Sequence, residues 1–401
     1  MNIILIFVLR TPDKMEKQIE NILSQVAEIV QQDRKQKELT GDNFNMFDIL
    51  GLQASETKHS AFIAELLNPK GSHGFGDSFL QKFIKSIDYL KDLRLNTKKV
   101  DVQIEYPINW GRIDILIKSE NKAIIIENKI YATDQDSQLF RYSEFGESEF
   151  SDFRLVYLTR DGHKASDYST KKKLREDEHY IRISYQTDIL QWLERCYRLS
   201  SEKPIVNNAI NQYLNIVRKL TNQDMSRQNE TKVLDILTEK DNVDATLVIL
   251  NRKDAIRKKI FEKYLVRPLQ QFAKRNDLQL DTDELFKNRR YHSIYLYKEN
   301  WHRSAIRIAA GSPDCWEGFQ IAIESRDDKP RFRNIYESIF QKHSDNERPF
   351  GWEFLDDKYQ NWNDDILPAI IDGKVVKHLK DKIKKALYDL ESMESQGIKI
   401  P

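Results

Sequence analysis

The stretch GRIDILIKSENKAIIIENKI, at residues 111–130, constrains the fold more than any other part of this chain. Two isoleucine-rich runs flank the polar segment SENK, a pattern that predicts two antiparallel strands joined by a tight turn. A symmetric turn at SENK pairs Lys118 with Ala123, and the same register places Asp114 directly opposite Glu127. The sequence therefore predicts two carboxylates that face each other across a pair of strands.

The residues around these carboxylates divide between the two faces of the predicted hairpin. Because strand side chains alternate with a period of two, Lys129 shares the face of Asp114 and Glu127. The opposite face is apolar and is expected to pack on the core; it carries Ile113, Ile115, Ile117, Ile124, Ile126 and Ile130.

Like charges directly across a strand pair are destabilising, so this arrangement needs an offsetting interaction. A divalent cation is the natural candidate, and ligation by carboxylate oxygens favours a hard ion such as Mg²⁺ or Mn²⁺. Such an ion lowers the pKa of bound water and stabilises charge on a phosphate. Lys129 beside it would orient or activate the attacking water. The alternative interpretation is an exposed hairpin face whose carboxylates are simply solvated.

Composition and motifs exclude several other classes of protein. Lysine and arginine number 64 against 63 aspartates and glutamates, so the net charge gives no general attraction to nucleic acid. The 401 residues contain two cysteines, too few for a disulfide framework or a cysteine zinc site, which favours a reducing cytoplasm. We find no GxxxxGKS/T phosphate loop, no GxSxG nucleophile motif and no zinc-spaced His/Cys cluster.

The N-terminal end is apolar but resembles neither a signal peptide nor a membrane span. The segment MNIILIFVLR, at 1–10, has no basic region ahead of its apolar run and no small-residue cleavage site, and it is too short to cross a bilayer. Helical spacing of apolar residues begins at Met15, which we expect to be the physiological start. Residues 1–42 are predicted to form an N-terminal segment and helix.

The rest of the chain divides by pattern into two domains. Helical and strand periods alternate over 43–222, which is typical of an α/β domain. Residues 223–401 begin with long helical patterns, continue with strand-like runs and end in a helix, so we expect a C-terminal α+β accessory domain. Its role would be target recognition, partner binding or dimerisation, and a homodimer is one expectation. Its tryptophans and arginines are interpreted either as a surface that stacks bases or as sheet core with a solvated rim.

Several of these motifs resemble those of a known family. Asp114 followed by Glu127-Asn128-Lys129 on the adjacent strand resembles the D…(D/E)xK core of the PD-(D/E)xK nuclease superfamily. The segment at 56–80 is similar to the opening helix and loop of a bacterial and phage branch of this superfamily. DQDSQLFRY resembles the QxxxY helix of its exonuclease-like members. The first aspartate follows isoleucine instead of proline, a departure from the family pattern.

The resemblance implies a restriction-endonuclease-like core, with a mixed central sheet flanked by helices, and it implies roles for particular residues. The metal ligands would be Asp114, Glu127, Glu56 and the main-chain carbonyl of Asn128, and Lys129 would be the catalytic lysine. Gln138 would line the catalytic site. Contacts with the nucleic acid backbone would come from Tyr142, Arg112 and Ser60. Glu65 is a rival to Glu56, and His59 is more typical of a structural residue.

The function implied by the resemblance is metal-dependent hydrolysis of phosphodiester bonds. We expect Mg²⁺ or Mn²⁺ as cofactor, DNA as the substrate, a cytoplasmic location with no membrane association, and a setting in defence against phage or mobile DNA. The alternative is a nucleic-acid-binding or regulatory module that keeps the fold and has lost the chemistry. The intact D…ExK…Q set argues against that alternative, because loss of function would first erode the lysine or a carboxylate. DNA against RNA and endonuclease against exonuclease stay open.

Overall fold

The computed structural model divides the chain into two compact units, which are described separately. Unit 1 comprises Met1–Ile130 and Asp134–Arg252, and unit 2 comprises Tyr131–Thr133 and Lys253–Pro401. The structure describes residues 12–52, 55–109, 111–132, 134–286, 292–301, 304–311, 316, 318–325, 339–340, 342–343, 351–397 and 400. The predicted N-terminal apolar run lies outside these described residues. Helix α1 (Pro12–Thr40) begins ahead of Met15, where the helical pattern was expected to start.

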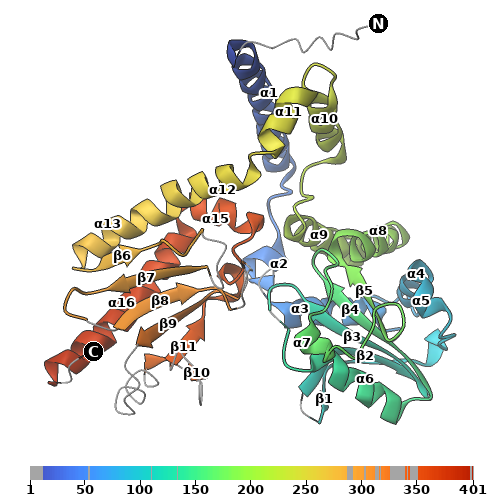
Figure 1. The fold of residues 1–401 in the computed structure, drawn as a ribbon. Helices are drawn as coiled ribbons and strands as arrows, with labels where there is room; N and C mark the ends of the chain where they lie inside the picture. Colours follow the sequence, from blue (N-terminus) through green and yellow to red (C-terminus); the bar gives the residue numbers. More distant parts are fainter. Residues whose placement is uncertain are drawn as a thin grey trace, which may run out of the picture. The chain divides into compact units, whose positions relative to one another are not determined.

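Unit 1 is built on a mixed five-stranded sheet (Figure 1). The antiparallel part consists of β1 (Asp101–Ile108), β2 (Gly111–Ser119) and β3 (Lys122–Lys129). From β3 onward the sheet is parallel and continues with β4 (Asp152–Thr159) and β5 (Tyr180–Ser184). The flanking helices include α3 (Glu56–Leu67), α6 (Gln138–Glu149), α8 (Leu190–Leu199) and α9 (Pro204–Leu220). The predicted α/β class, with a mixed central sheet flanked by helices, is confirmed.

The predicted hairpin register between β2 and β3 is also confirmed. Lys118 pairs with Ala123, and the ladder continues to Ile115 opposite Ile126. The turn is shorter than SENK, because Ser119 and Lys122 already pair and only the two residues between them make the reversal. Beyond Ile115 the backbone ladder gives way to a side-chain contact from Asp114, which is part of the candidate site.

The hairpin is buried on both faces, and this departs from the single apolar face that the alternation predicts. The predicted core residues Ile115, Ile117, Ile124 and Ile126 are fully or almost fully buried. The face that carries the carboxylates also forms a core with α6; its buried members are Leu116, Ala123, Ile125, Leu139, Tyr142, Leu155, Tyr157 and Tyr180. Ile113, which the alternation places on the opposite face, also belongs to this core, so the prediction is wrong for that residue. A central strand covered by helices on both faces reads as a nearly continuous apolar run, as AIII does here.

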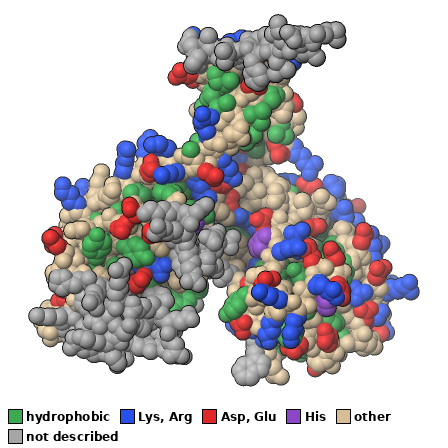
Figure 2. Space-filling model, viewed as in Figure 1, with side chains coloured by type: hydrophobic (Ala, Val, Ile, Leu, Met, Phe, Trp, Pro, Cys, Tyr) green, Lys and Arg blue, Asp and Glu red, His purple; other side chains and the backbone are tan. Residues whose placement is uncertain are grey.

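Helices α10 (Arg227–Thr238) and α11 (Val243–Leu250) pack on α1 and lie in unit 1. The sequence-based division assigns residues 223–252 to the accessory domain, whereas the contacts of these helices group them with α1. Figure 2 shows hydrophobic side chains gathered over these three helices, and several are exposed there: Leu23 by 56%, Leu234 by 53%, Leu247 by 48% and Leu250 by 62%. These helices therefore bury little apolar surface of their own.

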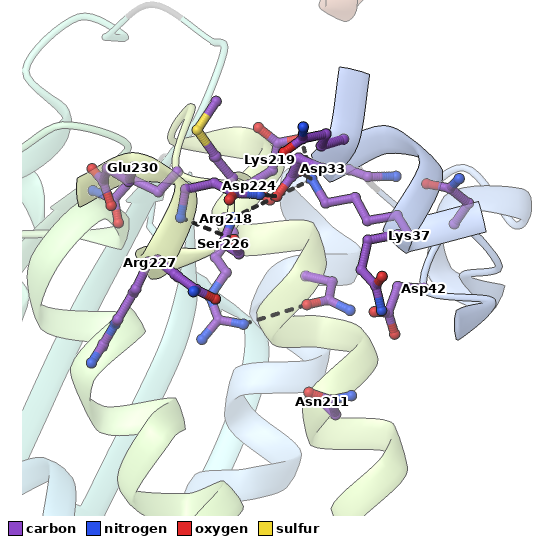
Figure 3. Close-up of a pocket in the computed structure, with 18 of the residues that line it drawn as sticks. Asp33, Lys37, Asp42, Asn211, Arg218, Lys219, Asp224, Ser226, Arg227 and Glu230 are labelled. Carbon is purple, nitrogen blue, oxygen red and sulfur yellow. Dashed lines mark hydrogen bonds and ion pairs between the residues drawn. The ribbon is translucent and has the colours of Figure 1, made fainter. Parts of the chain in front are cut away.

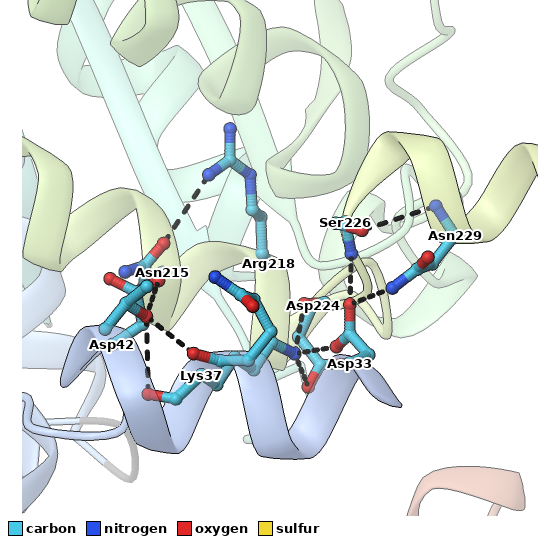
Figure 4. Close-up of polar contacts among 10 residues, drawn as sticks. Asp33, Lys37, Asp42, Asn215, Arg218, Asp224, Ser226 and Asn229 are labelled. Atoms are coloured by element: carbon cyan, nitrogen blue, oxygen red, sulfur yellow. Dashed lines mark hydrogen bonds and ion pairs between the residues drawn. The ribbon is translucent and has the colours of Figure 1, made fainter. Parts of the chain in front are cut away.

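A polar cavity of about 790 Å³ lies between α1, α9 and the start of α10 (Figure 3). Asp33 of α1 holds the beginning of α10: its carboxylate accepts hydrogen bonds from Ser226 N at 3.1 Å and Asn229 Nδ2 at 2.9 Å (Figure 4). Lys37 pairs with Asp33 at 2.8 Å and with Asp224 at 3.4 Å. The cavity is thus lined by groups that already satisfy one another, and we interpret it as a structural junction.

Substitution of Asp33 by Asn is expected to weaken this junction. Burial raises the pKa of Asp33, but hydrogen bonds from Lys37, Asn229 and Ser226 more than offset it and lower the pKa to about 2. Removing a charged acceptor should cost about 1–3 kcal/mol in the free energy of unfolding.

The pH dependence of this effect follows from the lowered pKa. Because the pKa of Asp33 is lowered in the folded state, this carboxylate stabilises the fold at any pH above its pKa in the unfolded chain, ~3.9. The contribution is lost as the pH falls through the pKa of the folded state. Melting temperatures of wild type and Asp33→Asn should therefore converge between about pH 4 and about pH 2. Asp42→Asn is the matched control, because that exposed carboxylate accepts only from Thr40 Oγ1 among the hydrogen bonds described here. An equal loss in both variants would contradict the assignment.

Unit 2 carries a six-stranded antiparallel sheet, which confirms the predicted α+β accessory domain. Its order is β10 (Lys342–His343), β11 (Gly351–Phe354), β9 (Gln320–Ser325), β8 (Ser304–Ala309), β7 (Ser293–Tyr297) and β6 (Gln279–Asp281). Residues of α13 (Arg267–Arg275) and α16 (Lys374–Ser395) share one apolar core with the sheet.

Two tryptophans of unit 2 belong to this apolar core. Trp301 is 4% exposed and Trp362 is fully buried, stacked on Phe319 with ring centroids 3.9 Å apart. These two residues therefore form sheet core and do not offer a surface for stacking bases. Within the described residues of the whole chain, no helix has the length and apolar character needed to cross a membrane.

Candidate active site

The candidate site lies where β2 and β3 leave their regular ladder. The backbone N–H of Asn128 donates to Asp114 Oδ2 at 2.6 Å. This side-chain hydrogen bond joins the two strands beyond the point where their backbone ladder ends. On β3, Lys129 Nζ lies 2.8 Å from Glu127 Oε1. The local sequence produces this cluster directly, because a hairpin of this register places the three side chains on one face.

The cluster is buried, and the alternative of a solvated hairpin face is therefore wrong. Glu127 is 1% exposed and Lys129 is 5% exposed. Burial and the neighbouring charge of Glu127 raise the pKa of Asp114 well above its ordinary value. Burial also raises the pKa of Glu127, although Lys129 opposes that effect. Both carboxylates thus hold protons more tightly than in water, as expected where negative charge lacks enough compensation.

Lys129 keeps its positive charge in this environment. Burial by itself lowers the pKa of the ammonium group, but the charges of Glu127 and Glu56 outweigh it, so the pKa is raised. One ammonium group therefore faces three carboxylates, from Asp114, Glu127 and Glu56. The site carries a local excess of negative charge that a cation would neutralise.

One oxygen of Glu127 is left without a protein partner. Its Oε2 is buried and makes no hydrogen bond. A buried acceptor without a partner costs about 1–3 kcal/mol, so such an atom calls for an explanation. A divalent metal ion fits here, because the available donors are carboxylate oxygens of the kind that Mg²⁺ and Mn²⁺ prefer.

The third acidic residue, Glu56, begins helix α3 and reaches β3 from the side. Its Oε1 accepts from the backbone N–H of Ile130 at 2.6 Å. Asn128 Nδ2 donates to the Glu56 carbonyl at 3.2 Å and to Ser60 Oγ at 2.9 Å, so the start of α3 is tied to β3. In this arrangement, no group of three or more His, Cys, Asp or Glu side chains is poised to hold a metal among the described residues.

A buried polar network supports Asn128 from behind, and sequence reasoning missed it. Tyr185 donates its hydroxyl to Asn128 Oδ1 at 3.0 Å. Tyr213 of α9 lies within hydrogen-bond distance of His59 Nδ1, at 2.9 Å. His59 is buried within this network, and its structural role stays a prediction. Neither tyrosine belongs to a motif, so only the tertiary contact identifies them.

Gln138 and Tyr142 lie on one face of α6, and they approach the carboxylates from the other side. Gln138 Nε2 donates to the Tyr142 hydroxyl at 3.3 Å, and that hydroxyl donates to the carbonyl of Arg112. Burial, followed by the charge of Glu127, raises the pKa of Tyr142. The tyrosine thus stays neutral beside the acidic cluster.

The three predicted nucleic-acid contacts differ in exposure. The Arg112 side chain is 69% exposed and lies 3.5 Å from Glu105 in an ion pair, so it can turn to an external phosphate. Ser60 and Tyr142 are each 1% exposed. Their contact with nucleic acid stays a prediction, and it would require neighbouring groups to move.

Tyr157 is a further residue of the site that has no motif. In the parallel pair of β3 and β4 it lies opposite Glu127. Its hydroxyl donates to Asp134 Oδ1 at 2.9 Å, and Asp134 also accepts from Ser166 N at 2.8 Å. This contact anchors the segment that leads into α6. A tyrosine within the apolar run of β4 was the only signal in the sequence.

A comparison with known families agrees with this geometry. The model of the PD-(D/E)XK nuclease superfamily matches residues 44–215. Residues 44–215 belong to the PD-(D/E)XK nuclease superfamily. The resemblance inferred from the motifs is thereby confirmed, and the matched region contains all five strands of the first sheet. No curated protein and no solved structure matches the chain.

Membership in this nuclease superfamily explains why the charges are concentrated in this place. The prediction that Asp114, Glu127 and Lys129 occupy the D…ExK positions, and Gln138 and Tyr142 those of QxxxY, falls on residues inside the matched range. The superfamily consists of nucleases that generally use divalent metal ions, in agreement with the unpartnered oxygen of Glu127.

Proposed function

We propose that this PD-(D/E)XK protein is a metal-dependent nuclease that hydrolyses phosphodiester bonds in DNA with Mg²⁺ or Mn²⁺. The observation that carries the proposal is the buried cluster of Asp114, Glu127 and Lys129, with Glu127 Oε2 left without a partner. A cluster held only for stability would be expected to satisfy that oxygen. In a catalytic site that is completed by a cation, the cation itself would be the partner of that oxygen.

The proposed metal ligands are Asp114, Glu127, Glu56 and the main-chain carbonyl of Asn128. When bound, the ion would lower the pKa of a water molecule and stabilise charge on the phosphate. Glu56 would exchange its hydrogen bond with Ile130 for the ion or for a water molecule on it. The network behind Asn128 holds the backbone of β3 in place for this ligation.

The other residues would act on the phosphate and on the water. Lys129 stays protonated, and its ammonium group is paired with Glu127. Lys129 would therefore stabilise negative charge in the transition state and orient the water. Gln138 would line the site through its contact with Tyr142. The exposed Arg112, whose carbonyl accepts from the Tyr142 hydroxyl, would contact the backbone of the substrate.

DNA as substrate and a role in defence against phage or mobile DNA are proposals that rest on the resemblance to the superfamily and, for 56–80, to its bacterial and phage branch. A cytoplasmic location is a proposal that rests on the presence of only two cysteines in the sequence. A homodimer also stays a prediction. Light scattering of the purified full-length chain measures its mass in solution, and a monomer at micromolar concentration would contradict the dimer.

Cleavage by the purified full-length chain tests the proposal. Linear duplex DNA, closed circular DNA, single-stranded DNA and single-stranded RNA should each be incubated with Mg²⁺, Mn²⁺ or EDTA. We expect cleavage of DNA with either metal and none with EDTA, and cutting of the circular form would identify an endonuclease. Binding of nucleic acid without cleavage under every condition would favour the inactive binding module.

A further inference from the structure

Unit 2 contains a groove of about 490 Å³ between helix α16 and the helical segment η4 (Glu262–Val266). We call it the lysine groove, because four of the residues that line it are lysines: Lys263, Lys377, Lys380 and Lys384. The one acidic residue among those lining it is Asp381. The groove therefore carries a concentrated positive charge on a chain whose formal net charge is only +1.

These four lysines share the groove with one carboxylate, that of Asp381. In the described part of the chain, none of the four forms an ion pair. Two other lysines of α16 are paired: Lys374 lies 2.9 Å from Asp372, and Lys382 lies 2.7 Å from Glu353. An ordinary solvated helix face would be expected to mix both signs of charge, as the rest of α16 does.

The spacing of the lysines fits a chain of phosphates. Lys377, Lys380 and Lys384 are three and four residues apart, so they lie on one face of α16. They span about 10 Å along the helix axis. Nucleic acid carries one phosphate per ~3.4 Å of axis on each strand, so this span matches about three phosphates. Like charges at these spacings repel, and a bound polyanion would relieve that repulsion.

The groove also has aromatic rings beside two of its lysines. Tyr264 contributes an aromatic ring, with Lys263 Nζ 4.9 Å from its centroid. Lys380 Nζ lies over the ring of Phe272, 5.9 Å from its centroid, so this ammonium group is held beside an aromatic face. Ammonium groups held in this way contact phosphate without reading bases.

We propose that the lysine groove binds the phosphate backbone of nucleic acid and gives unit 2 its own, sequence-independent hold on the substrate. The proposal rests on the proposed nuclease function for the identity of the ligand. It does not depend on cleavage, because the groove uses no residue of the catalytic cluster.

Binding of a labelled 30-base-pair duplex to the full-length chain, in EDTA and over a range of salt, tests this. The variant replaces Lys377, Lys380 and Lys384 with Gln. We expect binding at least about tenfold weaker at low salt, and a slope of log K against log salt that is smaller by about 2–3, near 0.9 for each lost phosphate contact. The variant should melt at or above the wild-type temperature, because it relieves repulsion between lysines.

A triple variant with the same loss of charge is the matched control: Lys374, Lys385 and Lys259 replaced with Gln, all outside the groove. It should keep the wild-type salt slope. Equal slopes in the two triple variants would overturn the proposal, as would undiminished duplex binding by the groove variant. The two proposals can fail separately. If the wild type cleaves DNA and the groove variant binds the duplex normally, the groove proposal is refuted and the nuclease proposal is not. If the wild type binds the duplex through the groove but never cleaves it, the nuclease proposal is refuted and the groove proposal is not.

Discussion

Replacing Lys129 with Met is expected to reduce DNA cleavage by about 10²–10³-fold, the loss found when one group that stabilises transition-state charge is removed. Among the described residues, Lys129 is the ammonium group that pairs with Glu127, at 2.8 Å, and its pKa is raised, so it supplies positive charge to the site. Metal binding should persist or strengthen, because an ammonium group is not a ligand and its removal leaves more negative charge.

Two measurements check this prediction. Cleavage of linear DNA gives the rate, and the rise in melting temperature with millimolar Mg²⁺ or Mn²⁺ reports binding of the ion. The matched control is Lys122→Met on the same strand, a lysine that donates to the Leu93 carbonyl at 2.8 Å and lies outside the site. The assigned role of Lys129 would be refuted by near-normal cleavage in Lys129→Met, or by a loss no larger than that of the control.

Replacing Asp114 with Asn is expected to separate stability from metal binding. Asn keeps an oxygen that accepts from the backbone N–H of Asn128, while the repulsion with Glu127 disappears. The free energy of unfolding in EDTA should therefore be unchanged or higher by up to about 1 kcal/mol. The thermal shift with Mg²⁺ or Mn²⁺ and the cleavage of DNA should both collapse.

The pH dependence of the protein without metal gives a further check on Asp114. A carboxyl whose pKa is raised in the folded state stabilises the fold at low pH, and this contribution is lost as the pH rises through the folded pKa. The advantage of Asp114→Asn in EDTA should accordingly grow as the pH rises.

The control for Asp114→Asn is Asp101→Asn, an exposed aspartate of β1 that lies 3.7 Å from Lys118. This control should keep both the metal-induced shift and the cleavage. A metal-induced thermal shift that survives in Asp114→Asn would show that this carboxylate is not a ligand. If wild type shows no shift either, with or without nucleic acid, the inactive binding module becomes the better interpretation.

Much of the catalytic cluster can be read from the sequence, and the reason is local. The period of two along β2 and β3 and the short turn between them determine which residues face each other. Asp114, Glu127 and Lys129 follow from that register without knowledge of the rest of the fold. Likewise, the spacing of four residues between Gln138 and Tyr142 is enough to place them on one face of a helix.

Other parts of the site and fold depend on contacts between distant segments, and no periodic pattern in the sequence encodes them. The support of Asn128 by Tyr185 and the contact of Tyr213 with His59 arise only when α9 and the segment after β5 close over α3. Packing on α1 assigns residues 223–252 to unit 1.

Burial, too, is decided by the tertiary structure. Alternation in a hairpin allows a solvated face, and here the covering helix α6 turns that face into an interior one. The same covering makes a pair of carboxylates and a lysine costly to hold without a cation, and it leaves Glu127 Oε2 without a partner. The sequence by itself thus determined which charged groups meet, and the tertiary structure decided that they meet away from water, where a missing ligand has the largest energetic effect.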